Sequence, residues 1–397
     1  MSTVLKMEKL CDIAELNPKF KEKLESESSV SFVPMAAVLA EMSTVTGEEK
    51  QYNEVSKGYT SFVDGDLLVA KITPCFENGK ITQAKLKNRV GFGSTEFHVV
   101  RPVEEKLDAR YLLHFLRQER IRIEGERKMT GSAGQRRVPA NFLAGLEIPL
   151  PPLPEQKRIA DILDRAEALR AKRRAALARL DELTEAIFID MFGDSVSNPM
   201  GWKRYPLKHC VNHIQIGPFG SLLHKDDYVF GGIPLINPTH IENGKIVPDL
   251  NQSITVQKHA ELQLYQLQQG DVIMGRRGEM GRCAIVGSEH NGMLCGTGSL
   301  FIRPNESRAI AMYLQATLSS ESMRKHLEGF SLGATLPNLN RGIVGELAIS
   351  LPPIEMQKEF SHRIESIEKL KATYKSSLTE IDELFLSLQY RTFRGEL

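Results

Sequence analysis

A segment of the chain returns 201 residues after its first occurrence. Leu150-Pro-Pro-Leu-Pro-Glu-Gln-Lys157 reappears as Leu351-Pro-Pro-Ile-Glu-Met-Gln-Lys358, and Leu180-Asp-Glu-Leu183 reappears as Ile381-Asp-Glu-Leu384. Solenoid repeats have periods of roughly 20 to 50 residues, so this period is too long for a repeat array. It predicts the duplication of a whole domain together with a following helix, and therefore a molecule with two similar working ends.

A weaker correspondence links the segments upstream of the two copies. Gly65-Asp-Leu-Leu-Val69 matches Gly270-Asp-Val-Ile-Met274, and Arg101-Pro102 matches Arg303-Pro304. Short β-forming runs between Gly, Asn, Asp and Pro turns, with helical stretches after each Arg-Pro, indicate mixed α and β lobes of about 150 residues. We therefore expect a first lobe at 1–149, a helical region at 150–196, a second lobe at 197–350 and a second helical region at 351–397.

Each proline-rich segment opens a stretch with core positions at alternating steps of three and four. This heptad pattern predicts a coiled coil, and two equivalent units paired about a pseudo-two-fold axis would run their helices antiparallel. Arg173 and Tyr374 occupy equivalent positions, so the guanidinium should stack on the ring at the seam. From Ile159 to Ile187 the rise is about 42 Å, roughly 12 base pairs of DNA. The expected seam residues are Ile159, Leu169, Arg173, Leu180, Leu183, Ile367, Leu370, Tyr374, Ile381 and Leu384.

Composition is that of a globular protein and lacks enzyme signatures. The 397 residues are 41% hydrophobic, and no apolar run approaches the roughly 20 residues of a membrane span. Five cysteines form no Cys-x-x-Cys pair, which is typical of a reducing cytoplasm. There is no Gly-x-x-x-x-Gly-Lys-Ser/Thr phosphate loop, and Ile236-Asn-Pro-Thr-His240 lacks the second proline and the aromatic residue of an amino-methyltransferase motif. We expect no catalytic residue, no metal site and no cofactor.

Basic residues gather in loops although the net charge is only +1. Arginines beside glycines, as in the loop at 275–282, can reach phosphates and base edges, whereas the basic helical stretch before residue 128 could simply be a solvated face. The loops at 72–76 and 276–280 are unlike, so two lobes that read DNA through them would be expected to recognise unlike half-sites of an asymmetric, interrupted target. Candidate DNA-binding residues are Lys71, Lys80, Gln135, Arg136, Arg137, Arg276, Arg277, Arg282, Asn338 and Arg341.

The repeated proline-rich helix openings and the two Gly-Asp lobes resemble the specificity subunit of type I restriction-modification systems. The resemblance covers essentially the whole chain, although Glu355-Met356 replaces Pro154-Glu155 in the second copy. It implies an α+β fold: two mixed α/β target recognition domains joined by two long helices that form an antiparallel coiled coil with pseudo-two-fold symmetry.

The same resemblance implies partners. Each lobe would read one half of a bipartite site in double-stranded DNA, while the helices would set the spacer and dock two modification (methyltransferase) subunits that methylate adenine with S-adenosylmethionine. Two restriction/translocase subunits would join only in a system that also cleaves DNA. The chain itself would be a non-catalytic cytoplasmic subunit without membrane contact.

Three alternatives remain open at this point. A coiled-coil scaffold would use the same heptads but leaves the two loop-rich lobes unexplained. A self-sufficient DNA methyltransferase would need the motifs that are missing. A modification-only system without a motor subunit cannot be separated from full restriction by sequence.

Overall fold

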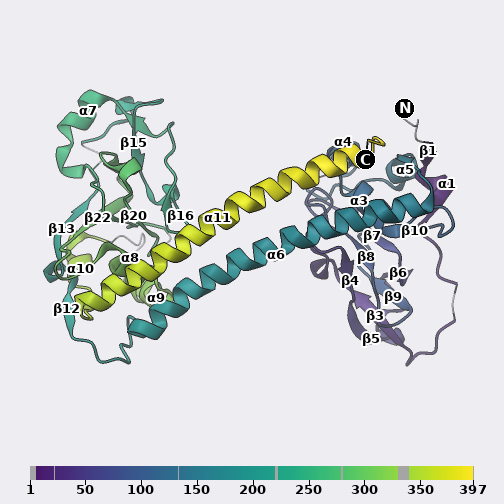
Figure 1. Ribbon diagram of the computed structural model, residues 1–397, viewed down its shortest axis with the longest axis horizontal. Coiled ribbons are helices and arrows are strands. Elements are labelled where there is room, and N and C mark those ends of the chain that lie inside the picture. Colours follow the sequence, from purple (N-terminus) through teal and green to yellow (C-terminus); the bar gives the residue numbers. More distant parts are fainter. Residues whose placement is uncertain are drawn as a thin grey trace. The chain divides into compact units, whose positions relative to one another are not determined.

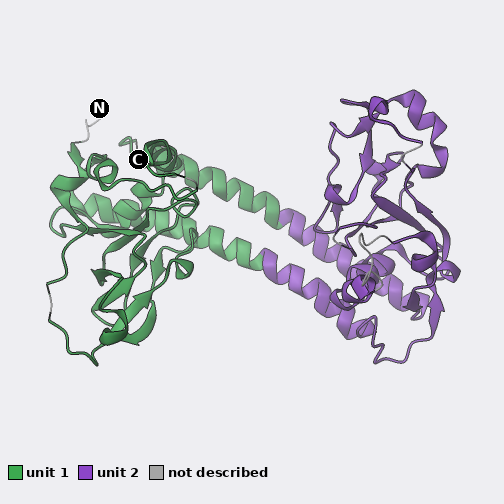
Figure 2. Cartoon of the chain, turned by 180° about the vertical axis from the view of Figure 1, so that it is seen from behind, with its two compact units in different colours: residues 1–176, 374–397 green, residues 177–373 purple. Residues whose placement is uncertain are grey.

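The computed structural model describes residues 6–396 except 22, 133, 220–221, 279 and 330–338. The chain divides into two compact units: residues 1–176 with 374–397 form unit 1, and residues 177–373 form unit 2 (Figure 2). Each unit contains one lobe and part of both long helices. This division does not test the expected domain boundaries at 149, 196 and 350, which therefore remain a proposal. Within the described ranges, no helix is both long and apolar enough to cross a membrane.

Two small sheets form the lobe of unit 1 (Figure 1), one with the order β2-β10-β7-β8-β4 and one with the order β5-β3-β9-β6, and a β1-β11 pair ties the start of the lobe to its end. The strands are β1 (Met7–Lys9), β2 (Ala14–Leu16), β3 (Ser29–Val33), β4 (Thr44–Val45), β5 (Glu48–Gln51), β6 (Thr60–Val63), β7 (Leu67–Ala70), β8 (Ile81–Ala84), β9 (Val90–Gly93), β10 (Phe97–Pro102) and β11 (Glu147–Pro149). The helices are α1 (Leu10–Ile13), α2 (Tyr52–Val55), α3 (Ala109–Leu116), α4 (Glu119–Lys128) and α5 (Ala140–Ala144). All four residues of β7 are buried, which places this strand at the centre of the lobe.

The lobe of unit 2 contains a four-stranded sheet of order β13-β22-β19-β20, a second of order β14-β18-β15-β21, and the pairs β12-β23 and β16-β17. Its strands are β12 (Arg204–Pro206), β13 (Val211–Ile216), β14 (Tyr228–Val229), β15 (Ile233–Ile236), β16 (Ile241–Glu242), β17 (Lys245–Ile246), β18 (Ser253–Ile254), β19 (Val272–Gly275), β20 (Cys283–Ile285), β21 (Leu294–Cys295), β22 (Ser299–Pro304) and β23 (Ala348–Ser350). Its helices are α7 (Val256–Glu261), α8 (Ala311–Ser319), α9 (Glu321–Gly329) and α10 (Arg341–Gly345). As in unit 1, the central pair is antiparallel: β7 with β10 there, β19 with β22 here.

The weak upstream repeat corresponds to one ion pair in each lobe. Asp66, which is 1% exposed, accepts hydrogen bonds from Nε and Nη2 of Arg101 at 2.8 and 2.7 Å. Asp271 is equally buried and accepts from the same two nitrogens of Arg303, both at 2.8 Å. Because a buried carboxylate is tolerated only when it is paired, the Gly-Asp and Arg-Pro signatures must occur together in each lobe.

The glutamine of each proline-rich segment fastens a long helix to its lobe. Gln156 is fully buried; its amide donates to the carbonyl oxygens of Lys106 and Pro151, and its own oxygen accepts from the backbone N–H of Asp108. Gln357, also fully buried, makes the corresponding three bonds in unit 2. A side chain with both donors and an acceptor is required here, since buried backbone groups must find partners. The motif is therefore structural.

The long helices are α6 (Leu153–Phe192) and α11 (Ile354–Thr392). Both are free of interior glycine and of proline beyond the first turn, and α6 ends where Gly193 takes a left-handed conformation with φ +74°. In unit 1, Arg173 lies at Tyr374 while Arg170, one turn earlier, pairs with Asp382. Partner numbers rise as α6 numbers fall, so the two helices pack antiparallel, as expected.

Six of the ten expected seam positions are buried or half-buried. Ile159 and Ile367 are buried, and Arg173, Leu180, Tyr374 and Ile381 are half-buried. The alternate positions were wrong by one residue: the exposed leucines are Leu169 at 56%, Leu183 at 44%, Leu370 at 40% and Leu384 at 56%. The residues that face the seam instead are Arg170, Thr184, Lys371 and Phe385.

Polar residues at the seam explain the error at three of the four positions, Phe385 being apolar. A search for apolar heptads selects leucine over a neighbouring arginine, lysine or threonine. However, the aliphatic stems of Arg170 and Lys371 can pack along the seam while their charges find acids on the opposite helix. Arg170 pairs with Asp382 at 2.5 Å, and Lys371 pairs with Asp181 at 2.9 Å. Lys371 lies 201 positions after Arg170, and Asp382 lies 201 positions after Asp181. The two ion pairs are therefore equivalent in the duplication.

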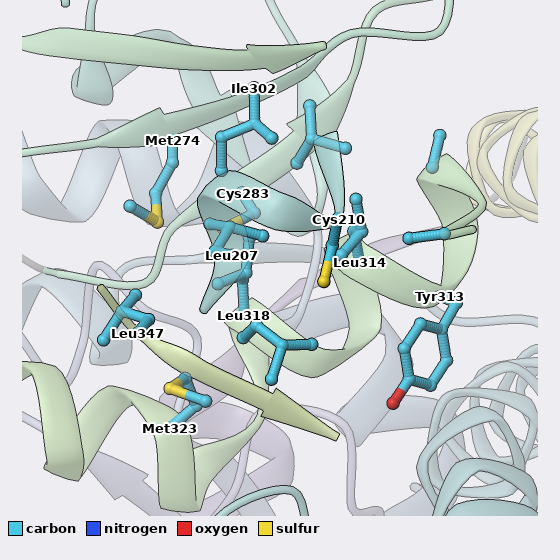
Figure 3. Close-up of a cluster of buried hydrophobic side chains, with 14 of the residues drawn as sticks. Leu207, Cys210, Met274, Cys283, Ile302, Tyr313, Leu314, Leu318, Met323 and Leu347 are labelled. Carbon is cyan, nitrogen blue, oxygen red and sulfur yellow. The ribbon is translucent and has the colours of Figure 1, made fainter. Parts of the chain in front are cut away.

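The core of unit 2 accounts for two of its cysteines. Cys210 and Cys283 lie among Leu207, Met274 and Ile302, and side chains of α8 complete the cluster (Figure 3). Burial raises the pKa of both thiols above the ordinary value. These thiols therefore behave as small apolar side chains.

Candidate nucleic-acid interface

Three separate segments of unit 1 meet where β7 ends. The backbone N–H of Lys71 donates to the carbonyl of Glu96 at 2.9 Å, and the N–H of Val138 donates to the carbonyl of Lys71 at 2.8 Å. Thr73 N–H also donates to the carbonyl of Arg136. The loop after β7, the start of β10 and the polar loop before α5 therefore form one cluster, which we call the first loop cluster.

Unit 2 repeats this arrangement at the end of β19. The backbone N–H of Arg276 donates to the carbonyl of Gly298 at 3.0 Å, and the N–H of Leu339 donates to the carbonyl of Arg276 at 3.0 Å. Arg276 therefore takes the place of Lys71, and Gly298 takes the place of Glu96. We call this the second loop cluster. The two lobes share little sequence, yet the same pattern of backbone hydrogen bonds positions a lysine side chain in one and an arginine side chain in the other.

The first loop cluster brings together most of the residues proposed for that lobe. Gln135 is exposed, while Lys71, Arg136 and Arg137 are half-buried. Arg136 lies 3.9 Å from Glu77 and 3.8 Å from Glu126. Two carboxylates within ion-pair distance therefore offset the charge of Arg136.

Lys80 and His98 lie beside this cluster. Nζ of Lys80 donates to the carbonyl of Met35 at 3.3 Å, so part of its donor capacity is used inside the lobe. His98 donates from Nε2 to the carbonyl of Val138 and accepts from Asn17 at Nδ1. Burial lowers the pKa of this imidazole, so it supports the loop as a neutral side chain.

The residues proposed for the second lobe separate into buried and exposed groups. Arg276 is only 3% exposed, burial and neighbouring Arg277 lower its pKa, and its Nε has no hydrogen-bond partner among the residues that the structure describes. This burial argues against direct DNA contact by Arg276. Arg277 and Arg341 are exposed, and Arg282 is half-buried. Asn338 lies outside the described residues.

Carboxylates inside the first loop cluster were missed by the sequence reasoning. Glu96 accepts Nε of Arg137 at 2.9 Å and Nη2 at 2.8 Å, and this hydrogen bonding lowers the pKa of Glu96 below its ordinary value. A search for basic residues in loops does not select acids. The available signal was the position of Glu96 in the short turn between β9 and β10.

Large apolar side chains, among them the misassigned leucines, are exposed on the long helices. They are Leu169, Leu384, Leu386 and Tyr390 in unit 1, and Leu183, Ile189 and Leu370 in unit 2. Large apolar side chains exposed in this number on two helices favour a protein contact. In contrast, the described part of the chain contains no group of three or more His, Cys, Asp or Glu residues placed to hold a metal ion.

The chain belongs to the family described as the type I restriction modification DNA specificity domain, which matches residues 4–179 and 216–383. Residues of the chain are 47% identical over 152 positions to the type I restriction enzyme EcoEI specificity subunit of Escherichia coli, covering 38% of this chain and 25% of that protein. The EcoBI specificity subunit of Escherichia coli is 26% identical over 325 residues, covering 74% and 67%.

The fold has a solved counterpart. The crystal structure of the type I restriction-modification system S subunit from M. genitalium superposes with a TM-score of 0.55 at 16% sequence identity, covering 98% of this chain and 96% of that one. At that identity the likeness concerns the fold alone, and it agrees with the expected two lobes and long helices. In two of the curated relatives, the matched region spans about a quarter of the protein's length.

Proposed function

We propose that this chain is the DNA sequence-recognition subunit of a type I restriction-modification complex, with each lobe reading one half of an asymmetric bipartite site. The observation that carries the proposal is the pair of equivalent loop clusters. Lys71 and Arg276 occupy the same backbone frame, yet Glu96 stands beside one and Gly298 beside the other. A shared frame with different side chains supports two heads of one kind that read different bases.

The long helices are proposed to set the spacer between the half-sites. The equivalent pairs Arg170–Asp382 and Lys371–Asp181 support a fixed register, because a slip of one helix along the other would separate both. A helix rises about 1.5 Å per residue, against about 3.4 Å per base pair along DNA. Adding one heptad to both helices should therefore lengthen the preferred spacer by about three base pairs.

Two modification subunits are proposed to dock on the exposed leucines of the helices. Leu183 and Leu384 are equivalent positions of the duplication, as are Leu169 and Leu370, which supports two similar docking surfaces. The modification subunits would supply S-adenosylmethionine chemistry, so this chain would be non-catalytic and would work in the cytoplasm. Restriction/translocase subunits would join in a system that also cleaves DNA.

The direct test is a selection of bound DNA. The chain, purified together with its modification subunits, is mixed with random duplexes at about 0.15 M salt, and bound duplexes are sequenced. The proposal predicts enrichment of one motif with two specified parts and an unspecified gap. A stable complex that binds DNA without sequence preference, or not at all, would instead support a coiled-coil scaffold.

A further inference from the structure

Arg137 in the first loop cluster has an unusually well-defined set of hydrogen bonds. Its Nε and Nη2 both bind the carboxylate of Glu96, and its Nη1 donates to the carbonyl of Gln135 at 3.0 Å. The backbone of Arg137 is also fixed. Its N–H donates to the carbonyl of Thr130 at 2.8 Å, and its carbonyl accepts from the N–H of Thr130 at 3.0 Å. The guanidinium is therefore held from two directions before any ligand arrives.

A count of donors shows what remains available. A guanidinium has five N–H groups, and these contacts use three of them. One N–H remains on Nη1 and one on Nη2, and the side chain is 41% exposed. Two donors on neighbouring nitrogens match two neighbouring acceptors, such as O6 and N7 of guanine in the major groove or two oxygens of a phosphate.

The charge of Glu96 favours the guanine edge over the phosphate. Affinity for phosphates comes from net positive charge that displaces counterions. Glu96 offsets the charge of Arg137, so the pair gives little net attraction for the DNA backbone. What the carboxylate supplies is orientation, and orientation matters most for a contact that must match one base.

Resting on the proposed function, we propose that Arg137 reads a guanine in the half-site of the first lobe and that Glu96 is the positioning residue that aims it. The second lobe has Gly298 where the first has Glu96, and glycine has no side chain that could hold an arginine. An arginine oriented by a glutamate at this position therefore occurs in the first lobe and not at the equivalent position of the second. Substitution of Arg137 or Glu96 should alter the base preference in only one half of the recognised sequence.

The test uses the full chain in complex with its modification subunits. Equilibrium binding is measured on duplexes that carry each base at each position of the wild-type motif, and the slope of affinity against salt is recorded for each protein. Arg137→Lys keeps the charge but loses the paired donors. Glu96→Gln keeps an acceptor but releases the fixed orientation.

Arg158→Lys is the matched control, since Arg158 makes the same paired contact with Glu155, at 2.8 and 2.6 Å, but at the start of α6. Melting curves of all variants establish that the lobes stay folded. If either loop variant proves unfolded, the other carries the test, because Lys and Gln perturb different partners of the same pair.

The inference predicts that Arg137→Lys lowers the preference for guanine at one position by roughly 5- to 150-fold. Glu96→Gln should weaken the same position to a smaller extent, with the other half-site and the salt slope unchanged. Equal weakening on every duplex, or with Arg137→Ala a salt slope lower by about one, would identify a phosphate contact and overturn the inference. Base preferences no different from those of Arg158→Lys would also overturn it. A wild-type complex without any motif would instead refute the proposed function.

Discussion

The guanidinium of Arg173 lies over the ring of Tyr374, 4.3 Å from its centroid, where the two long helices of unit 1 pack together. The two residues are equivalents of each other in the duplication, 201 positions apart. In an antiparallel pair about a pseudo-two-fold axis, equivalent residues meet only at the point where the axis crosses the seam. The contact was predicted from the heptad register, and its presence supports that register.

Removing this contact should destabilise the helix pair. Tyr374→Ala and Arg173→Ala should each lower the free energy of unfolding by about 1 to 2 kcal/mol, because a partly desolvated cation and ring attract each other and the ring also packs apolar surface. Urea unfolding followed by circular dichroism measures the change. Lys172→Ala, an exposed neighbour, is the control. Strictly additive losses in the double variant would show that the two side chains do not interact.

The glutamines of the proline-rich segments give a second stability prediction. Gln357→Ala should cost about 2 to 4 kcal/mol, since it leaves two carbonyl oxygens and one N–H buried without their partner. Gln357→Glu should cost more, because a carboxylate would face two carbonyl oxygens. Thermal melting compares these variants with Lys358→Ala, an exposed change one residue later. A melting temperature unaffected by Gln357→Ala would contradict the structural role of the motif.

The duplication and the helices were accessible from sequence because they depend on local repeats, while much of the rest depends on distant pairing. Strand β7 pairs with β10, which lies about thirty residues further along the chain, and such pairings leave no local pattern. Four of the ten expected seam positions were wrong, and in two cases a search for apolar periodicity chose a leucine over the neighbouring Arg170 or Lys371. In the candidate site, basic residues could be selected from the sequence by residue type alone. The Glu96–Arg137 contact could not, because it depends on how the chain folds.

A pH dependence follows from the turn after α6. Asp194 accepts the backbone N–H groups of Ser197 and Val196 at 2.7 and 3.1 Å. Hydrogen bonds from the Ser197 backbone and the Ser322 side chain outweigh the opposing effect of burial and lower the pKa of Asp194 to about 2. The folded pKa lies below the unfolded value of 3.8, so the stabilisation is complete above that value and is lost as the pH falls toward 2.

Asp194→Asn should therefore be less stable than the wild type at pH 5, and the difference should shrink between pH 3.8 and 2. Chemical unfolding at a series of pH values measures it, with Asp190→Asn, an exposed carboxylate near the end of α6, as the control. A difference that stayed constant across this window would show that ionisation of Asp194 does not contribute.

The exposed leucines of the helices predict a separation between stability and assembly. Leu384→Ser should change the free energy of unfolding by less than about 0.5 kcal/mol, yet weaken binding to the modification subunits about tenfold or more if that leucine is central to the contact. Leu163→Ser, on the buried face of α6, should instead destabilise the chain by more than about 2 kcal/mol. If the Leu384→Ser variant bound the modification subunits as tightly as the wild type, the docking surface would have to lie elsewhere on the chain.

The most direct measurement of the two-headed account is a map of methylated adenines across cellular DNA after co-expression of this chain with its modification subunits, read by single-molecule sequencing. The account predicts one interrupted motif whose two specified parts differ in sequence. An uninterrupted motif, a palindromic one, or methylation without a motif would contradict the claim that two unlike lobes each read one half of the site.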